Sequence, residues 1–282
     1  MNHRTHSPTL IRSPAPGGLA AVLVFFFFGT GCGDDSSAGS PPSPDAGDDG
    51  MGRDGGPSPE DAGPPDAGPL REVACQDESI ATLMLFETPS PRGVIASEGG
   101  PVWTETIDAT AGGIAADESY VYLRFTERGL EKVDLSDEAA FVSLAWDIAF
   151  RRFVIRLNSG VSGPGNVVAA RTTPETSFDG LDGVPDGLAF REERYFTDTC
   201  EYVSDGSGIG SPATALASYW TYPGCVSMTG NVFVLRRGDG RHVKFEVLRY
   251  YPPENQRSCD ETSMISFPSG GGNVSVQWAF LD

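Results

Sequence analysis

Apolar and polar residues alternate along most of the chain after its first quarter, with the two-residue period of half-buried β-strands. In the segment 119–125, Val121 and Phe125 fall on one face and Tyr122 on the opposite face. The segment 273–280 near the C-terminus alternates in the same way. Because successive side chains of a strand point to opposite faces, this pattern predicts strands rather than helices.

A short turn sequence joins two of the predicted strands. Gly238-Asp239-Gly240 separates the segments 232–237 and 241–251, and an Asp-Gly pair tolerates the positive φ angles of tight hairpin turns. No long segment shows a helical period, and Gly and Pro interrupt nearly every candidate strand. The sequence therefore predicts an all-β domain built mostly of antiparallel strands.

The N-terminus has the pattern of a targeting segment. Residues 18–28 form an uncharged apolar run preceded by two arginines. The run is shorter than the roughly 20 residues of a membrane-spanning helix and is typical of a signal peptide. It is followed by Gly29-Thr30-Gly31-Cys32, which resembles a bacterial lipobox except that position −3 is Gly rather than Leu. We predict a lipoprotein signal peptide over residues 1–31 and lipidation of Cys32; an ordinary secretory signal is the alternative.

Residues 33–70 have the composition of a tether. They contain nine Gly and eight Pro in 38 positions, and no Phe, Tyr, Trp, Val or Ile. Such a segment cannot bury enough apolar surface to offset its chain entropy, so we expect it to be disordered. Its random-coil reach is roughly 35 Å. The predicted organisation is a signal peptide at 1–31, a lipidated linker at 32–70 and one β domain at 71–282.

The charge excludes one class of partner. The chain carries 20 Lys and Arg against 39 Asp and Glu, for a net charge of −19. The predicted β domain has 30 acidic and 17 basic residues and thus a net charge of −13. Affinity for nucleic acid and for anionic lipid depends on Lys and Arg that neutralise phosphates. We therefore expect no nucleic-acid partner, and membrane contact only through the lipid anchor.

Catalytic signatures are absent from the sequence. Of three histidines only His242 follows the predicted signal peptide, and it lies beside the hairpin turn, where Lys244 and Glu246 on the same face should be exposed to solvent. Neither His-Glu-x-x-His nor Gly-x-Ser-x-Gly occurs, and the Gly-rich stretch 206–210 lacks the Gly-Lys-Ser/Thr of a phosphate loop. An exported hydrolase is thus disfavoured, and we predict a protein that is not an enzyme.

Four cysteines follow Cys32, namely Cys75, Cys200, Cys225 and Cys259. An even number of cysteines in an exported chain indicates two disulfides, and four cysteines allow three pairings. We favour Cys200–Cys225 and Cys75–Cys259, because the first two lie in the same loop-rich region. A zinc site would need short paired spacings that the sequence lacks.

One acidic loop has the chemistry of a calcium site. Asp179, Asp182 and Asp186 are spaced along a Gly-rich segment, and Ca²⁺ prefers oxygen ligands. The spacing does not match the 12-residue EF-hand pattern, so a solvated acidic loop is the favoured interpretation and a calcium site is the alternative.

Several motifs in the second half of the chain together resemble a known family. They are, in order, Trp146-Asp147-Ile148-Ala149-Phe150-Arg151-Arg152, residues 155–163, Phe178-Asp179, Pro185-Asp186-Gly187, Asp198, Trp220-x-Tyr222, residues 232–240, Lys244-Phe245 through Tyr250-Tyr251, and residues 276–280. The set resembles the HmuY family of haem-binding surface lipoproteins of Gram-negative bacteria, over roughly residues 115–282. The resemblance implies a mostly antiparallel β fold. The motifs also have structural interpretations: Asp147 should pair with an arginine or cap a turn, and the Asn158 side chain should satisfy backbone groups of the turn 158–160.

The resemblance implies haem as ligand, but the residues depart from the family. Its characterised members hold the iron through His pairs or Met, and residues 151–231 here contain no His. Met228 is the soft ligand in that region, although a lone Met more often fills an apolar gap. Two functions remain open. One is haem acquisition at the outer membrane or cell surface with atypical or absent axial ligands, with a surface receptor as a further partner. The other is a non-enzymatic lipoprotein that binds another ligand or protein.

Overall fold

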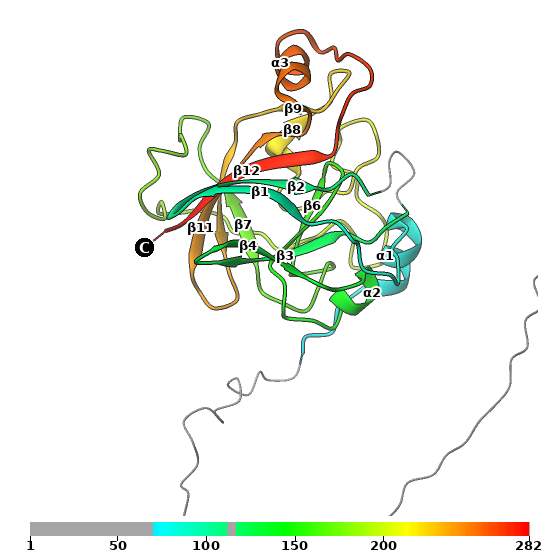
Figure 1. Ribbon diagram of the computed structural model, residues 1–282. Coiled ribbons are helices and arrows are strands. Elements are labelled where there is room, and N and C mark those ends of the chain that lie inside the picture. Colours follow the sequence, from blue (N-terminus) through cyan, green and yellow to red (C-terminus); the bar gives the residue numbers. More distant parts are fainter. Residues whose placement is uncertain (1–69, 112–116, 282) are drawn as a thin grey trace, which may run out of the picture. The chain divides into compact units, whose positions relative to one another are not determined.

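The computed structural model describes residues 70–111 and 117–281. The predicted signal peptide, Cys32 and all of the linker except its last residue lie outside the described residues. No helix within the described ranges has the length and apolar character needed to cross a membrane. Figure 1 shows strands in layers, with α1 and α2 at the right of the view and α3 at the top, beside the β8–β9 hairpin.

The described residues form mainly short strands. The elements are α1 (Gln76–Leu83), β1 (Val94–Gly99), β2 (Val102–Asp108), β3 (Val121–Thr126), β4 (Gly129–Val133), α2 (Asp137–Ala140), β5 (Ile148–Arg151), β6 (Val154–Leu157), β7 (Val168–Arg171), a 3₁₀-helix (Ala217–Tyr219), β8 (Trp220–Thr221), β9 (Ser227–Met228), β10 (Val232–Arg236), β11 (His242–Arg249), α3 (Pro253–Thr262) and β12 (Asn273–Leu281). The short helices do not change the fold class.

The strands form two larger sheets and one small hairpin. The six-stranded sheet has the order β1-β2-β12-β11-β10-β7, and the four-stranded sheet has the order β4-β3-β5-β6. All neighbours in both sheets are antiparallel, as are β8 and β9. The predicted all-β, mostly antiparallel fold is therefore confirmed.

The turn at Gly238-Asp239-Gly240 joins β10 and β11 as predicted, with Arg236 paired with His242. The C-terminal strand β12 lies between β11 and β2, so it connects the hairpin to the N-terminal strands of the same sheet.

The main core lies between the two larger sheets. It contains the inward-facing residues of β3, β5, β10, β11 and β12, including Phe125 and Trp278, whose ring centroids are 4.9 Å apart in an edge-on contact. The buried Glu105 side chain links the sheets by accepting hydrogen bonds from the Leu130 N–H at 3.0 Å and from the Trp278 indole N–H at 2.6 Å. A buried polar group costs free energy unless it is hydrogen-bonded, and Glu105 is.

The outer face of the four-stranded sheet is also buried. Tyr120, Tyr122 and Trp146 belong to a second core, to which α1 contributes Leu83 and α2 contributes Ala140. Strand β3 is therefore buried on both faces, which the alternation in the sequence did not show. The aromatic residues that alternate with Val121 and Phe125 are inside the protein because helices cover them.

A third apolar cluster covers the outer face of the six-stranded sheet. Phe178 and Leu181 pack there against Val234 of β10. This cover makes one expectation wrong: Lys244 is buried, and its Nζ donates a hydrogen bond to the Phe178 carbonyl at 3.0 Å. The loop 178–190 folds back over a strand face that the sequence pattern assigned to solvent.

Two buried polar residues of the family-like motifs bond as the type of residue predicts, although the partners of Asn158 lie outside the turn 158–160. The Asp147 carboxylate accepts a hydrogen bond from Arg237 Nε at 3.2 Å. The Asn158 side chain donates to the Trp146 carbonyl at 2.9 Å and accepts from the Gly165 N–H at 2.9 Å. Both side chains bond to groups that are distant in the sequence and that come together only in the folded protein.

The four cysteines form two disulfides, but the pairing predicted from the sequence is wrong. The bonds are Cys75–Cys200, with 5.4 Å between the Cα atoms, and Cys225–Cys259, with 6.0 Å. Cys75 at the start of α1 lies beside the turn that contains Cys200, and α3 carries Cys259 to the β8–β9 hairpin. Proximity along the chain misled the prediction, because the fold separates the two cysteines of the loop-rich region.

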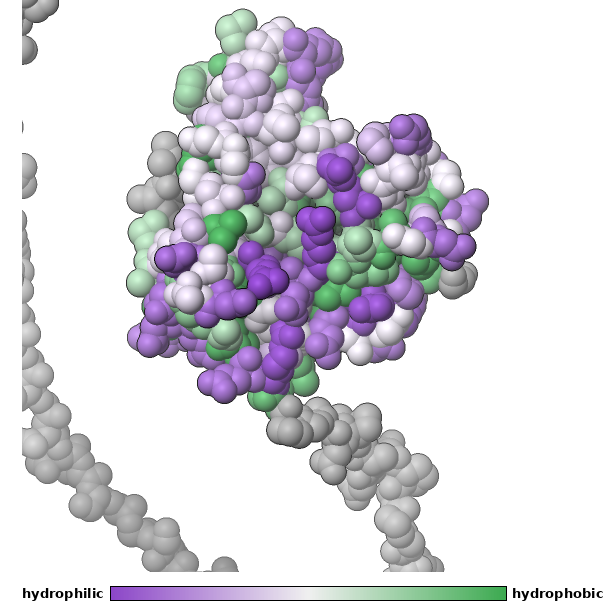
Figure 2. Space-filling view, turned by 180° about the vertical axis from the view of Figure 1, so that it is seen from behind, coloured by the Kyte–Doolittle hydropathy of each residue, from purple (hydrophilic) through white to green (hydrophobic). Residues whose placement is uncertain are grey.

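The surface is mixed in character. Figure 2 shows hydrophilic residues spread over the face seen from behind, with hydrophobic residues in separate patches between them. Isolated exposed apolar residues are normal for a soluble domain.

Candidate ligand-binding cavity

A cavity of about 780 Å³ lies beside the β8–β9 hairpin. Its wall is formed by the end of β7, by β8 and by the chain segments 204–207 and 213–218. This volume is within the range of about 300–1,000 Å³ that is usual for small-molecule sites. We call it the Trp220 cavity after the tryptophan in its wall.

Two aromatic side chains line the Trp220 cavity. Trp220 is 4% exposed and packs against Phe153, with 5.1 Å between ring centroids, so its indole is held rigidly. Tyr222 is 41% exposed and meets Trp220 edge-on at 6.3 Å. A flat apolar ligand would find one fixed aromatic group and one accessible aromatic group in this wall.

Backbone pairing and side-chain caps hold the β8–β9 hairpin in shape. Trp220 pairs with Met228 across the two strands. After β9, the Thr229 hydroxyl and the Asn231 amide both donate to the Ser218 carbonyl, at 2.9 and 2.7 Å. The segment before Trp220 is thereby attached to the segment after Met228, which fixes the position of the indole.

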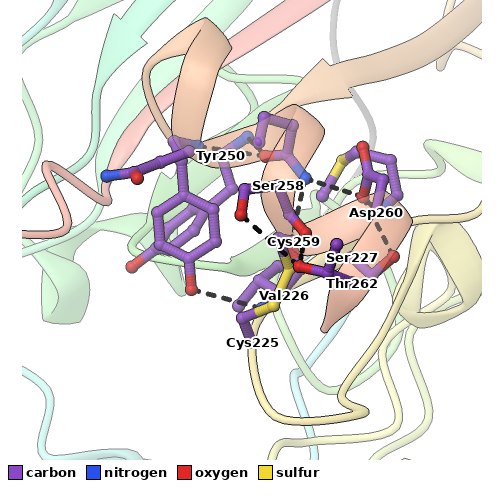
Figure 3. Close-up of a disulfide and its surroundings, with 12 residues drawn as sticks. Cys225, Val226, Ser227, Tyr250, Ser258, Cys259, Asp260 and Thr262 are labelled. Carbon is purple, nitrogen blue, oxygen red and sulfur yellow. Dashed lines mark hydrogen bonds between the residues drawn. A yellow bond between two sulfur atoms is a disulfide. The ribbon is translucent and has the colours of Figure 1, made fainter. Parts of the chain in front are cut away.

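Helix α3 fixes the other side of the hairpin (Figure 3). Besides the Cys225–Cys259 disulfide, Asp260 Oδ1 accepts hydrogen bonds from the Ser227 hydroxyl at 2.9 Å and from the Met228 N–H at 2.8 Å. One covalent bond and two hydrogen bonds to a carboxylate thus join α3 to the cavity wall. Hydrogen bonds to charged groups are among the stronger ones in proteins.

A buried carboxylate supports the cavity from behind. Glu193 is 1% exposed, and its two oxygens accept hydrogen bonds from the Leu157 and Ala215 N–H groups, each at 2.9 Å. Ala215 lines the cavity and Leu157 belongs to β6. Burial is the main cause that raises the pKa of Glu193 to about 7, although the two N–H donors and Arg156 favour the charged form.

Met228, the ligand candidate from the sequence, does not line the Trp220 cavity. Its side chain is half-buried and packs against the main core. The structure places it next to Trp220 in the hairpin but gives it the role of an apolar filler, which is the usual role of a lone methionine.

The acidic loop shows no gathering of ligands. Asp179, Asp182 and Asp186 are all exposed. Within the described part of the chain, the one group of three ligand-bearing side chains within 4.8 Å of one another is Cys75, Glu78 and Cys200. Since the two cysteines of that group form a disulfide, they offer no thiolate for a metal.

His242 is the single histidine of the described residues and lies at the start of β11. Its ring is half-buried, with its centroid 6.0 Å from that of Phe190. It does not line the Trp220 cavity.

Sequence reasoning missed two cavity residues. Arg171 and Arg191 both line the Trp220 cavity. Trp220 and Tyr222 belong to the family-like motifs, but the sequence assigns them no role. A charged residue at an alternating position of the strand 168–171 could have pointed to Arg171. Arg191, the second arginine of the cavity, is 20 residues further along the chain, so spacing alone does not link the two.

Comparison with protein families gives one match. The model of the family described as "HmuY protein" matches residues 116–267, which include β3 through α3 and therefore the whole Trp220 cavity. No curated protein sequence matches the chain.

Solved structures with a similar fold share little sequence with the chain. A candidate lipoprotein of Bacteroides fragilis is 16% identical with a TM-score of 0.41, over 66% of this chain and 93% of its own. A candidate HmuY-like haem-binding protein of Bacteroides vulgatus is 17% identical with a TM-score of 0.42, over 66% and 96%. The apo HmuY analogue of Tannerella forsythia is 18% identical with a TM-score of 0.37, over 69% and 98%. The family match, and not these likenesses, carries the assignment.

Proposed function

The chain belongs to the HmuY family, and from this premise we propose that it is a non-enzymatic lipoprotein that captures haem or a related tetrapyrrole in the Trp220 cavity. In this proposal the ligand is bound by aromatic packing in the cavity, and no His or Met side chain binds the iron.

One observation carries the proposal: a cavity of about 780 Å³ within the family-matched region has Trp220 and Tyr222 in its wall. Aromatic side chains favour stacked or edge-on packing with other rings; Tyr222 offers the accessible ring, and the buried Trp220 holds it in place by an edge-on contact. The rigid attachment of the hairpin to α3 lowers the entropy lost when a ligand binds, because the wall is already in place.

The side chains that line the cavity determine whether it can coordinate haem iron. Of the side chains that usually hold haem iron, His, Met and Cys are absent from the cavity lining, and the Tyr222 phenol is the one that remains. Haem would therefore be held mainly through its ring system, and Tyr222 is the lining side chain whose phenol oxygen could serve as an iron ligand.

The same donor set supports a second candidate function. A cavity without His, Met or Cys ligands suits a tetrapyrrole without iron, or another flat apolar molecule, as well as it suits haem. This keeps the alternative of a family member that binds a different ligand on the same scaffold.

We expect haemin titration of the oxidised protein to shift the Soret band, with saturation at micromolar haemin. Tyr222→Ala, a change at an exposed residue, should weaken binding by about tenfold because one aromatic contact is lost. Met228→Leu should leave the affinity and the spectrum unchanged, since the thioether packs in the core.

Phe267→Ala is the matched control. Phe267 is an exposed aromatic residue, 86% accessible, that does not line the Trp220 cavity, so its removal should not change haemin affinity. Absence of a Soret shift at micromolar haemin removes haem as the ligand. A spectrum that changes in Met228→Leu would show that methionine binds the iron after all.

The attachment to a membrane is a separate part of the proposal. The apolar run at 18–28 and the lipobox-like residues before Cys32 support export and lipidation, and the Gly- and Pro-rich segment that follows supports a tether of roughly 35 Å. We propose an outer-membrane or cell-surface location, where the domain would meet its ligand and a receptor.

In bacteria that express the full chain, the protein should incorporate labelled fatty acid and fractionate with membranes. Cys32→Ala should abolish the labelling, because no other residue follows the lipobox-like pattern. Fatty-acid labelling that persists in Cys32→Ala, or a wild-type protein recovered unlabelled from the medium, would contradict the lipid anchor.

A further inference from the structure

Two arginines of the Trp220 cavity lie on the inner face of the six-stranded sheet. In the register of β7 and β10, Arg171 is opposite Phe233 and Ala169 is opposite Leu235, and both apolar partners belong to the main core. Directly paired residues of antiparallel strands project to the same face. Arg171 is the last residue of β7, where this face reaches the cavity wall, and its side chain is exposed.

The second arginine comes from another part of the chain. Arg191 forms an antiparallel bridge with Ala169, through N–H to carbonyl hydrogen bonds of 2.8 and 3.0 Å in both directions. It is thus on the same face as Ala169 and a diagonal neighbour of Arg171, a spacing within reach of long side chains. The edge of the sheet brings two guanidinium groups to one side of the cavity.

Neither guanidinium group has an internal partner. The side chains of Arg171 and Arg191 make no ion pair or hydrogen bond with any residue of 70–111 or 117–281. Both side chains are exposed, so their guanidinium groups are accessible to a ligand that enters the cavity. An arginine is well suited to bind carboxylates in a bidentate manner.

The acidic residue in the cavity lining does not neutralise the pair. Asp205 accepts a hydrogen bond from the Ser207 N–H at 2.9 Å and forms no ion pair with either arginine. The same wall also contains Trp220 and Tyr222, so the cavity lining combines cationic and aromatic side chains.

We propose that Arg171 and Arg191 form a carboxylate-recognition subsite, so that the Trp220 cavity selects a planar aromatic ligand that carries free carboxylates. This inference rests on the proposed function for the site and specifies its ligand: a tetrapyrrole acid is bound and a tetrapyrrole ester is rejected. The selection acts through the side groups and is independent of the metal.

The test compares protoporphyrin IX with its dimethyl ester, measured by quenching of tryptophan fluorescence. The wild type should bind the acid about 10- to 100-fold more tightly than the ester, since charge-assisted hydrogen bonds to two carboxylates are lost in the ester. Arg171→Gln/Arg191→Gln should weaken binding of the acid by the same factor and leave the ester unchanged. Added salt should weaken binding of the acid only.

Arg257→Gln is the control, because Arg257 is an exposed arginine of α3 that does not line the cavity. It should leave both affinities unchanged. Equal binding of acid and ester by the wild type overturns the subsite but leaves tetrapyrrole binding intact. An equal loss of acid and ester in the double variant also overturns it.

If neither porphyrin binds, the proposed function fails, and 5-carboxyfluorescein, a planar aromatic carboxylate without a porphyrin ring, decides the subsite by fluorescence polarisation. Binding by the wild type that is lost in Arg171→Gln/Arg191→Gln supports the subsite for another ligand. Absence of binding by the wild type overturns the subsite as well.

Discussion

Loss of the Cys75–Cys200 disulfide is expected to lower the free energy of unfolding by about 5 kcal/mol, because the bond closes a loop with a sequence separation of 125 residues. A crosslink over so long a loop removes much of the conformational freedom of the unfolded chain. Cys75→Ala, Cys200→Ala and the double variant should all show the same loss in chemical denaturation under non-reducing conditions.

This pattern distinguishes the pairings. Substituting both cysteines of one disulfide should lower the free energy of unfolding no more than substituting one of them. Cys75→Ala and Cys225→Ala break different disulfides, so their losses of free energy should add. Non-reducing peptide mapping should recover Cys75 linked to Cys200 and Cys225 linked to Cys259. If instead Cys200→Ala and Cys225→Ala prove equivalent and non-additive, Cys200 is bonded to Cys225, and the pairing in the structure is refuted.

A second large effect is expected from the protonation of Glu193. Its pKa is about 7 in the folded protein against an ordinary value of 4.5, so between these pH values the folded protein holds a proton that the unfolded chain releases. The free energy of unfolding should therefore fall by about 3 kcal/mol as the pH rises from about 4.5 to about 7, and this contribution should stay level above that. Below pH 4.5 both states are protonated and the contribution is fully present.

Glu193→Gln should remove this dependence of the free energy of unfolding on pH. The difference between wild type and variant then separates the contribution of Glu193 from that of other titrating groups. Glu192→Gln, at the exposed neighbour that pairs with Arg71 on the surface, should keep the wild-type slope. Denaturant midpoints across pH 4 to 8 provide the measurement. A Glu193→Gln protein with the wild-type slope would show that the pH dependence comes from elsewhere.

The same residue connects stability with the ligand site. Glu193 accepts hydrogen bonds from Leu157 in β6 and from Ala215 in the cavity wall. A protonated carboxyl group attracts the two N–H donors less than a carboxylate does, because charge-assisted hydrogen bonds are stronger. The chain segment behind Trp220 is therefore held most firmly when Glu193 is charged, although the fold as a whole is then less stable.

Much of the fold followed from local sequence patterns. The alternation at 119–125 and 273–280 predicted β3 and β12, and the Asp239-Gly240 turn predicted the β10–β11 hairpin. These elements depend on the side-chain period of a strand and on the φ angles of a turn, and both are properties of neighbouring residues. That Asn158 bonds to backbone groups was predictable from the residue type, but its partners, Trp146 and Gly165, lie outside its own turn.

The predictions that proved wrong concern residues whose surroundings are formed by segments distant in the sequence. Lys244 looked exposed because its strand alternates, yet the loop that contains Phe178 folds over it. The disulfide pairing failed because α3 carries Cys259 back to the β8–β9 hairpin, a contact that spacing cannot reveal. The sequence also did not reveal Arg171 and Arg191 as residues of one cavity, because only the bridge between Ala169 and Arg191 brings them together.

By itself the sequence determined that this protein is an antiparallel β domain of the HmuY type, with a net negative charge and one histidine after its predicted signal peptide. Its strands and turns are local, so the residues themselves specify them. The tertiary structure alone decided which cysteines pair, which strand faces are covered and which side chains meet around the Trp220 cavity. The wall of a cavity is formed by segments far apart in the chain, and the packing of the whole core supplies the free energy that brings them together.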